Sequence, residues 1–393
     1  MKTVTCAVVV GGFVAFLGGG CGGDPAPDVP VTQAALENRA YIVARDSDDL
    51  TVIDLGTLQV AGRLKTGGVS NHMGDLNADF TKLYIDSSET DQTIVVDVTR
   101  LQVNGRISVG KHPTHLSLTP MGVFAVMNEY DNAVSFVDTA SDTEIKRLPG
   151  FYTPHFMRMS PDGRHGFVAN IGASHITRVD LQTLQIDKEI SLDGMPIPTE
   201  VPDETGFADA QINQDGILFA AHNSTGRVLR YDAKTDTLLP EIAVGANPWI
   251  IYAEHPFTNV AKRYLVPNFG SRTVSMLDAT ESTVMATMPG DQESFGVNYT
   301  SVAPQKAFVM NRIRRDISVV DLDAGIVTER IDVGGNTETA STTADGKLIV
   351  AAVSGADKVV VIDALTNRII KTFDNVGKYP WSVTIPRGQN YCH

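Results

Sequence analysis

The sequence predicts an all-β protein folded as an eight-bladed β-propeller, and three observations lead to this prediction. A β-rich unit recurs along the 393 residues. Each unit holds four short strands in about 42 residues, which is the length of one propeller blade. The unit that is incomplete at the N-terminal end is completed by a strand at the C-terminal end, as ring closure requires.

The clearest marker of the repeat is an aspartate that ends an alternating apolar segment and starts a polar turn. Residues 134–138 and 359–363 are typical, because β-branched residues alternating with period two indicate a strand. We expect each aspartate to accept hydrogen bonds from the turn that follows it. Eight aspartates hold this position, 41 to 52 residues apart: Asp54, Asp97, Asp138, Asp180, Asp232, Asp278, Asp321 and Asp363.

Two further markers divide each unit into strands. Tight turns such as 160–163 (Ser-Pro-Asp-Gly) and 343–346 (Thr-Ala-Asp-Gly) precede the second strand. An asparagine then closes that strand in five units: Asn128, Asn170, Asn223, Asn268 and Asn311.

The two ends of the chain predict how the ring closes. The first unit begins at Tyr41 with its second strand, and residues 379–385 supply the inner strand that it lacks. This pairing removes the exposed sheet edges that an open ring would leave. The predicted propeller domain spans residues 39–390, and seven blades remain the alternative if the unit near residues 254–261 is misread.

The N-terminal segment indicates export. Residues 1–20 resemble a signal peptide, with an apolar stretch over 4–17 that is too short to span a bilayer. Small residues before Cys21 resemble a bacterial lipoprotein cleavage site, which predicts a lipidated flexible tether over 21–38. The expected location is the periplasmic side of the outer membrane or the cell surface, with only the lipid in the membrane. A plain signal peptide with an incidental cysteine is the alternative.

Composition and missing motifs exclude several functions. A net charge of −14 argues against binding to nucleic acid, which needs clustered basic residues. Three cysteines and no Cys-x-x-Cys-His run exclude a disulfide framework and a c-type haem. There is no phosphate-binding loop, Gly-x-Ser-x-Gly motif or His-Glu-x-x-His motif. We therefore expect a binding protein rather than an enzyme, although the repeat pattern alone leaves this open.

Histidines recur at one place in the predicted blades. His72 and His155 lie five residues before the turn markers of blades two and four, and His115 is one position off that register in blade three. Because inner strands converge on the propeller axis, we predict that the three rings approach one another. Neutral imidazoles are ligands for copper, zinc or iron. The alternative is that each histidine only satisfies its own loop.

The repeats resemble those of YVTN-type propellers, with Phe-Val-Ala-Asn at 167–170 in the place of that tetrapeptide. Residues 41–46 resemble the first blade of the d1-haem propeller of cytochrome cd1 nitrite reductase and its biosynthetic relatives. The resemblance implies that His72 is an axial iron ligand. It also implies that the two distal histidines of that family are replaced by Ala208 and Asn247.

A d1-type tetrapyrrole would also need flat surfaces and cations. Trp249 and Trp381 each follow a proline at the expected channel mouth and could stack on a ring. Arg314, in the basic run 312–315, could meet the carboxylates of an anionic ligand; a solvated loop balancing Asp316 is the alternative.

Two functions follow from these observations. In the first, the propeller is an envelope platform that binds a partner protein or small ligand through its histidine-bearing axial face. In the second, it carries a d1-type haem or copper in a redox or cofactor-assembly pathway. The missing distal histidines favour the first.

Replacing Cys21 with alanine tests the predicted anchor. We expect the Cys21→Ala protein to move into the soluble periplasmic fraction or to keep its signal peptide, since the acceptor thiol for the lipid is gone. Cell fractionation with immunoblotting measures this. Unchanged membrane association would contradict a lipoprotein.

Overall fold

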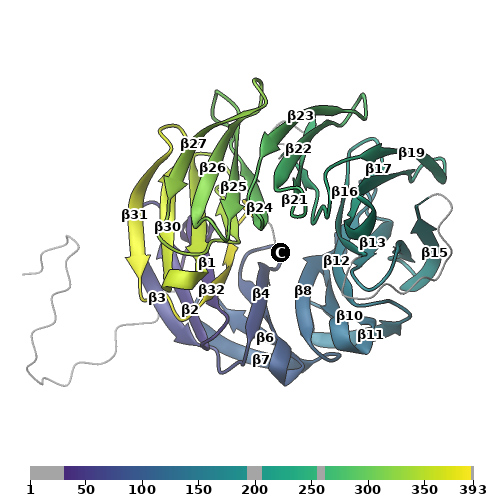
Figure 1. Ribbon diagram of the computed structural model, residues 1–393. Coiled ribbons are helices and arrows are strands. Elements are labelled where there is room, and N and C mark those ends of the chain that lie inside the picture. The colour runs from purple at the N-terminus through teal and green to yellow at the C-terminus, as the bar shows by residue number, and fades with distance from the viewer. Residues whose placement is uncertain (1–30, 193–205, 255–261, 391–393) are drawn as a thin grey trace, which may run out of the picture. The chain divides into compact units, whose positions relative to one another are not determined.

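The computed structural model describes residues 31–192, 206–254 and 262–390. In these residues eight antiparallel sheets stand around a ring, seven with four strands and one with five (Figure 1). The predicted eight-bladed β-propeller is confirmed, and the seven-bladed alternative is wrong.

In each blade one strand lies innermost in the ring, and a second strand pairs with it on the outer side. The inner strands are β4 (Asn71–Leu76), β8 (Pro113–Leu118), β12 (Pro154–Met159), β16 (Phe207–Ile212), β20 (Tyr252–Ala253), β24 (Ser294–Tyr299), β28 (Ala340–Thr342) and β32 (Pro380–Thr384). The second strands are β1 (Arg39–Ala44), β5 (Lys82–Ser87), β9 (Val123–Asn128), β13 (His165–Asn170), β17 (Ile217–His222), β21 (Arg263–Asn268), β25 (Lys306–Asn311) and β29 (Leu348–Val353).

Two more strands complete each blade toward the outside. The third strands are β2 (Asp49–Asp54), β6 (Gln92–Asp97), β10 (Ala133–Asp138), β14 (His175–Asp180), β18 (Arg227–Asp232), β22 (Thr273–Asp278), β26 (Asp316–Asp321) and β30 (Lys358–Asp363). The outer strands are β3 (Gln59–Lys65), β7 (Gln102–Ser108), β11 (Thr143–Pro149), β15 (Gln185–Ser191), β19 (Thr237–Ala243), β23 (Val284–Pro289), β27 (Ile326–Asp332) and β31 (Arg368–Asp374). A short strand, β33 (Gln389–Asn390), adds to β28 in blade eight.

All eight repeat aspartates end a third strand, as predicted. The Asp180 carboxylate accepts a hydrogen bond from the Thr183 N–H at 2.8 Å, and Asp363 accepts one from Thr366 at 2.7 Å. The other six accept a backbone N–H in the same turn. These bonds favour the charged carboxylate and so lower the pKa of Asp180 and Asp363. The aspartates therefore hold the hairpins that join third to outer strands.

The core is divided into layers between neighbouring blades. Tyr84 of blade two packs against Phe124 of blade three, with ring centroids 4.8 Å apart, inside one such layer. Second strands are buried along their length, while the outer strands alternate between half-buried and exposed residues. Each blade is therefore stabilised by both neighbours and not by a single central core.

The ring closes by pairing the last long strand with the first. β32 pairs antiparallel with β1, with Ile42 opposite Val383 and Tyr41 opposite Thr384. In Figure 1 the yellow β32 lies beside the purple β1. The predicted closure is confirmed.

Short helical turns connect second to third strands at one axial face. Turns of 3-10 helix follow four second strands: η1 (Ser88–Thr90), η2 (Glu129–Asp131), η4 (Asn223–Thr225) and η5 (Ser354–Ala356). The predicted signal peptide and most of the tether, including Cys21, lie outside the described residues.

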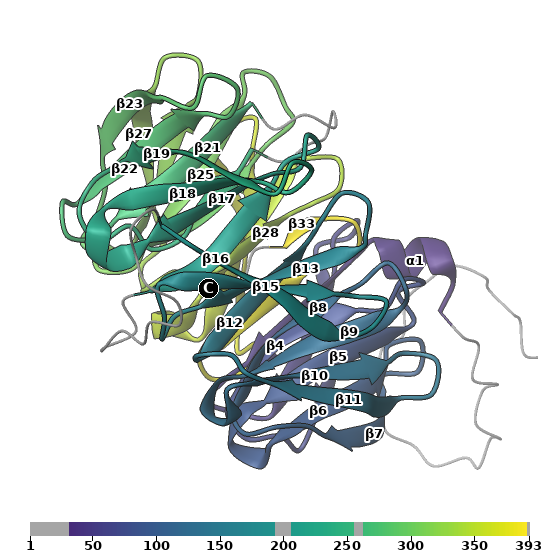
Figure 2. The same cartoon turned by 90° about the vertical axis from the view of Figure 1, so that its right-hand side faces the viewer.

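The end of the predicted tether is ordered, where a flexible segment was expected over residues 21–38. Residues 33–37 form helix α1 (Gln33–Glu37), visible at one side of the ring in Figure 2. Thr32 caps α1, and Leu36 is buried against blades one and two because its apolar side chain gains by leaving water. No helix in the described part of the chain has the length and apolar character needed to cross a membrane.

Disrupting the closure should destabilise the whole ring. We expect Val383→Asp to lower the free energy of unfolding by about 3 kcal/mol or more, since it places a charge at a position that is 3% exposed between blades. Deleting residues 379–393 should produce an aggregating chain. Val60→Asp, at a position 38% exposed on β3 of the same blade, is the matched control and should change stability little. Thermal unfolding measures all three; an unchanged melting temperature after the deletion would contradict the closure.

Candidate functional site

The three predicted histidines meet at the axis. They lie on the inner strands β4, β8 and β12, which are neighbours in the ring (Figure 1). The ring centroids of His72 and His115 are 5.0 Å apart, and those of His115 and His155 are 4.0 Å apart. Residues about 40 positions apart in sequence are thus in direct contact.

A bulge interrupts the strand pairing near the start of each of these three inner strands. The pairing shifts between Asn71 and Gly74 in β4, and between Pro113 and His115 in β8. β12 has the same shift after Pro154. Without bulges, a one-residue offset would send a strand side chain to the opposite face.

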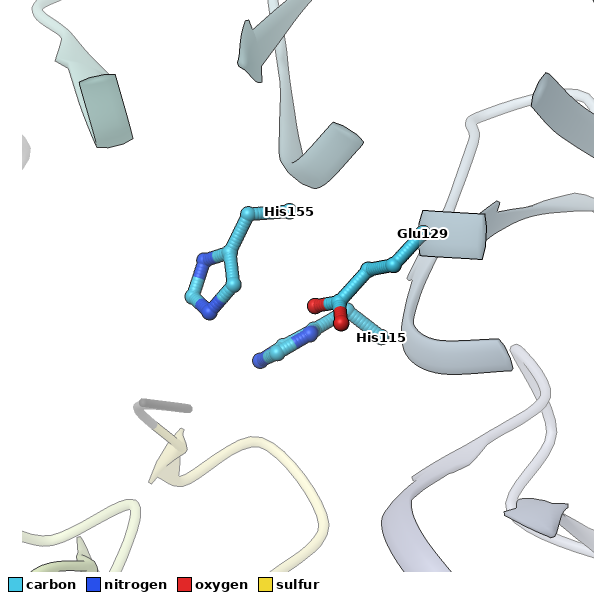
Figure 3. Close-up of side chains that lie close together, drawn as sticks. All are labelled: His115, Glu129 and His155. Carbon is cyan, nitrogen blue, oxygen red and sulfur yellow. The ribbon is translucent and has the colours of Figure 1, made fainter. Parts of the chain in front are cut away.

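Glu129 adds a carboxylate that the sequence did not single out. It begins η2, directly after the strand-closing Asn128, on the same axial face as the histidines. One ligand atom each from His115, Glu129 and His155 lies within 4.8 Å of the others, and the three side chains converge in Figure 3. The asparagine marker could have found it, because loops after second strands share the face of the inner-strand starts.

Hydrogen bonds to the backbone fix the tautomers of two histidines. The Nδ1 atom of His72 lies 2.8 Å from the Thr114 carbonyl oxygen, and that of His155 lies 2.7 Å from the Ala208 carbonyl oxygen. Because a carbonyl only accepts, Nδ1 carries the proton in both rings and Nε2 carries the lone pair. Both bonds join one inner strand to the next.

Thr114 links His115 to Glu129. The Thr114 hydroxyl donates to Glu129 Oε1 at 2.8 Å, and its oxygen lies 2.8 Å from His115 Nδ1. With the hydroxyl proton directed at the carboxylate, the oxygen accepts from Nδ1–H of His115. Nε2 is therefore the basic nitrogen of the third histidine too, which is the arrangement that metal-ligating histidines adopt.

Two of the three histidines, His72 and His155, are held in their neutral form. Burial lowers the pKa of His155 to about 4. Burial and the nearby Arg45 guanidinium lower the pKa of His72 to about 3. At pH 7 these imidazoles are unprotonated, which is the form that coordinates metals.

The histidine arc is part of a closed circuit of side chains around the axis. The two tryptophans flank the arc, with Trp381 5.3 Å from His72 and Trp249 6.4 Å from His155 between ring centroids. The remaining contacts follow in order around the ring. The Trp249 and Phe295 ring centroids are 6.3 Å apart, and Arg312 Cζ lies 5.4 Å from the Phe295 centroid. Glu338 Oε1 lies 2.9 Å from Arg312 Nε and 3.0 Å from the Tyr379 hydroxyl, and the Tyr379 and Trp381 centroids are 5.9 Å apart.

Arg314 does not join this circuit. Its Nε atom lies 3.4 Å from Asp316 Oδ2, and its Nη1 atom donates to the Gly290 carbonyl at 3.2 Å. The arginine of the basic run that lines the axis is Arg312, through its ion pair with the buried Glu338. The sequence placed the run on the correct face, but the local turn decides which arginine points inward.

The positions that the d1-type resemblance assigns to distal histidines have other uses here. The Ala208 carbonyl accepts the His155 hydrogen bond. The Asn247 amide donates to Asn223 Oδ1 at 3.3 Å. Neither side chain can transfer a proton near neutral pH.

No protein-family model and no curated protein matches this chain. Among solved structures it is similar to the dihydro-heme d1 dehydrogenase NirN in complex with DHE, with a TM-score of 0.76 and 14% identity over 92% of this chain and 78% of that one. Apo AztD from Citrobacter koseri gives 0.62 and 13% over 88% and 96%. Kuenenia stuttgartiensis hydrazine synthase gives 0.56 and 16% over 84% and 94%. The predicted resemblance to d1-haem propellers is thus confirmed as a likeness of fold.

The neutral state of His155 has a measurable consequence. Between about pH 6.5 and 4 the unfolded chain protonates this histidine and the folded chain does not, so stability falls as the pH falls through that window. His155→Asn retains an amide N–H in place of Nδ1–H but does not titrate. We expect the parent to lose about 2 kcal/mol more than this variant between pH 7 and 5.

Urea unfolding at both pH values measures this difference. His165→Asn is the matched control, because the His165 side chain is 22% exposed beside Asp187 on the other axial face. Equal pH dependence of the parent and His155→Asn would contradict a neutral His155.

Proposed function

We propose that this propeller is a binding platform whose histidine-bearing axial face holds a transition-metal ion. The observation that carries the proposal is the convergence of His115, Glu129 and His155 to within 4.8 Å. The propeller fold, shared with NirN and AztD, supports a binding role in general. The choice of face rests on the side chains.

The donor set suits a borderline metal. Two imidazole nitrogens and one carboxylate are ligands of zinc, copper and iron, and calcium or magnesium would require more oxygen donors. His72 packs edge-on against His115 and stands next to this set as a further donor. Two neutral imidazoles and one carboxylate give a dipositive ion three ligands and one negative charge. A bound anion or water would then complete its coordination.

The setting that we propose is the cell envelope. Export by residues 1–20 and lipidation of Cys21 would anchor the propeller on the periplasmic side of the outer membrane or at the cell surface. The axial face would then be available to an envelope protein or a small ligand.

A second candidate is a d1-type tetrapyrrole, and one observation favours it. Trp249 and Trp381 flank the histidine arc, and the indole N–H of each is buried with no hydrogen-bond acceptor among the described residues. His72, with its basic Nε2, is the residue that would ligate the iron of such a ring. NirN is described in complex with DHE, which supports a flat ligand on this fold. A bound tetrapyrrole would supply redox chemistry, but Ala208 and Asn247 give it no distal proton donor.

Titrating the purified mature chain with Cu²⁺, Zn²⁺ and haem tests both candidates. We expect metal binding by calorimetry, weakened on the order of 10- to 100-fold by Glu129→Gln and His155→Ala through loss of a ligand. His165→Ala, remote from the axis, should bind as the parent does. His72→Ala should weaken metal binding more than His165→Ala.

The absorption spectrum separates the alternatives. A Soret band on haem addition that is lost in His72→Ala but kept in Glu129→Gln would favour the tetrapyrrole. Equal affinities for the parent and all variants, or no binding of any probe, would remove both and leave a platform for a protein partner.

A further inference from the structure

A hollow lies on the same axial face, beside the histidine arc but lined by different residues. Its volume is about 380 Å³, and it lies between the loops of blades five, six and seven. The residues that line it include Asn223, Asn247, Trp249, Phe269, Gln292 and Glu293.

One side of the hollow is aromatic. Trp249 and Phe269 lie nearly parallel, 19° apart in plane and 5.8 Å apart between centroids. Phe295 braces this pair, 5.2 Å from Phe269. A braced aromatic surface of this kind offers a flat apolar contact at low conformational cost.

The other side carries amides whose hydrogen-bonding capacity is only partly used by the part of the chain that the structure describes. The Asn223 NH₂ group donates to the Pro248 carbonyl at 3.3 Å. The Asn247 NH₂ group donates to Asn223 Oδ1, also at 3.3 Å, so Asn247 keeps its own Oδ1 as an acceptor. Gln292 Oε1 accepts from Arg272 at 3.5 Å, which leaves its NH₂ group as a donor. The rim therefore offers both donors and acceptors on short, oriented side chains.

The carboxylate among the lining residues of the hollow, that of Glu293, is paired with a guanidinium. The Glu293 carboxylate accepts a hydrogen bond from Arg312 Nη1 at 3.2 Å, and the same guanidinium pairs with Glu338. The same guanidinium also lies over Phe295, 5.4 Å from the ring centroid. Because Arg312 pairs with it, the Glu293 carboxylate attracts a cation less strongly, and it can still accept hydrogen bonds from hydroxyl groups.

We propose that this hollow binds a neutral saccharide. The C–H face of a sugar ring fits the Trp249 surface, and its hydroxyls match the mixed donors and acceptors of Asn247, Gln292 and Glu293. The volume lies within the range of small-ligand pockets, roughly 300–1,000 Å³. The site uses none of the proposed metal ligands, so the two can be tested separately.

The chain has only two tryptophans, which gives a direct reporter. In Trp381→Phe the emission comes from Trp249 alone. We expect a saturable change in that emission when the mature chain is titrated with at least one of glucose, galactose, mannose, N-acetylglucosamine, maltose or trehalose at millimolar concentrations.

Two substitutions in that background locate the site. Gln292→Ala removes the donor, and Asn247→Gly removes the acceptor while tolerating the left-handed backbone (φ 50°) of that position. Each should weaken saccharide binding about tenfold, the cost of one lost hydrogen bond. Gln102→Ala, an exposed glutamine on β7, is the matched control and should bind as the parent does.

Three outcomes would overturn the proposal: no response to any sugar in the panel, equal affinity in Gln292→Ala and the parent, or a response to choline in place of the sugars. Cu²⁺ titration of the same variants keeps the two proposals apart. Metal binding retained without a saccharide response counts against the saccharide site alone.

Discussion

The pairing of β32 with β1 is the constraint on which the rest of this structure depends. It joins the C-terminal strand to the first blade and makes every sheet a neighbour of two others. Since the core is a set of layers between blades, an open ring would expose the apolar faces of blades one and eight, where Ile42, Val350 and Val383 now share one cluster. Closure also sets the spacing of the inner strands, and with it the distances between side chains at the axis.

The hydrogen bonds of His72 and His155 serve both the fold and the candidate metal site. His72 and His155 each donate to a carbonyl on the neighbouring inner strand, at Thr114 and Ala208. The same bonds therefore tie adjacent blades together and turn the basic Nε2 atoms toward a potential ligand. Desolvation keeps the rings neutral, which removes their charge from the interior and leaves the lone pairs for coordination. A structural role and a binding role thus need the same geometry.

The two candidate sites lie on one axial face and differ in the kinds of side chain that they present. Blades two to four present imidazoles and a carboxylate. Blades five to seven present aromatic rings, amides and the Glu293 carboxylate, which is paired with Arg312. Trp249 lies between the two sites, 6.4 Å from His155 and within the saccharide hollow. A ligand large enough to span this boundary would contact both.

The sequence by itself determined the eight blades, the aspartate turns, the closing strand and the common position of His72, His115 and His155. These are properties of a repeat, in which each unit encodes its own strands and the period brings equivalent residues to the axis. It did not single out Glu129, and it favoured Arg314 where Arg312 lines the channel. Those outcomes depend on a one-turn helix and on the conformation of a single loop, which direct side chains without leaving a periodic signal. Only the tertiary structure decided which polar groups face one another, because contacts between blades join residues that no local pattern relates.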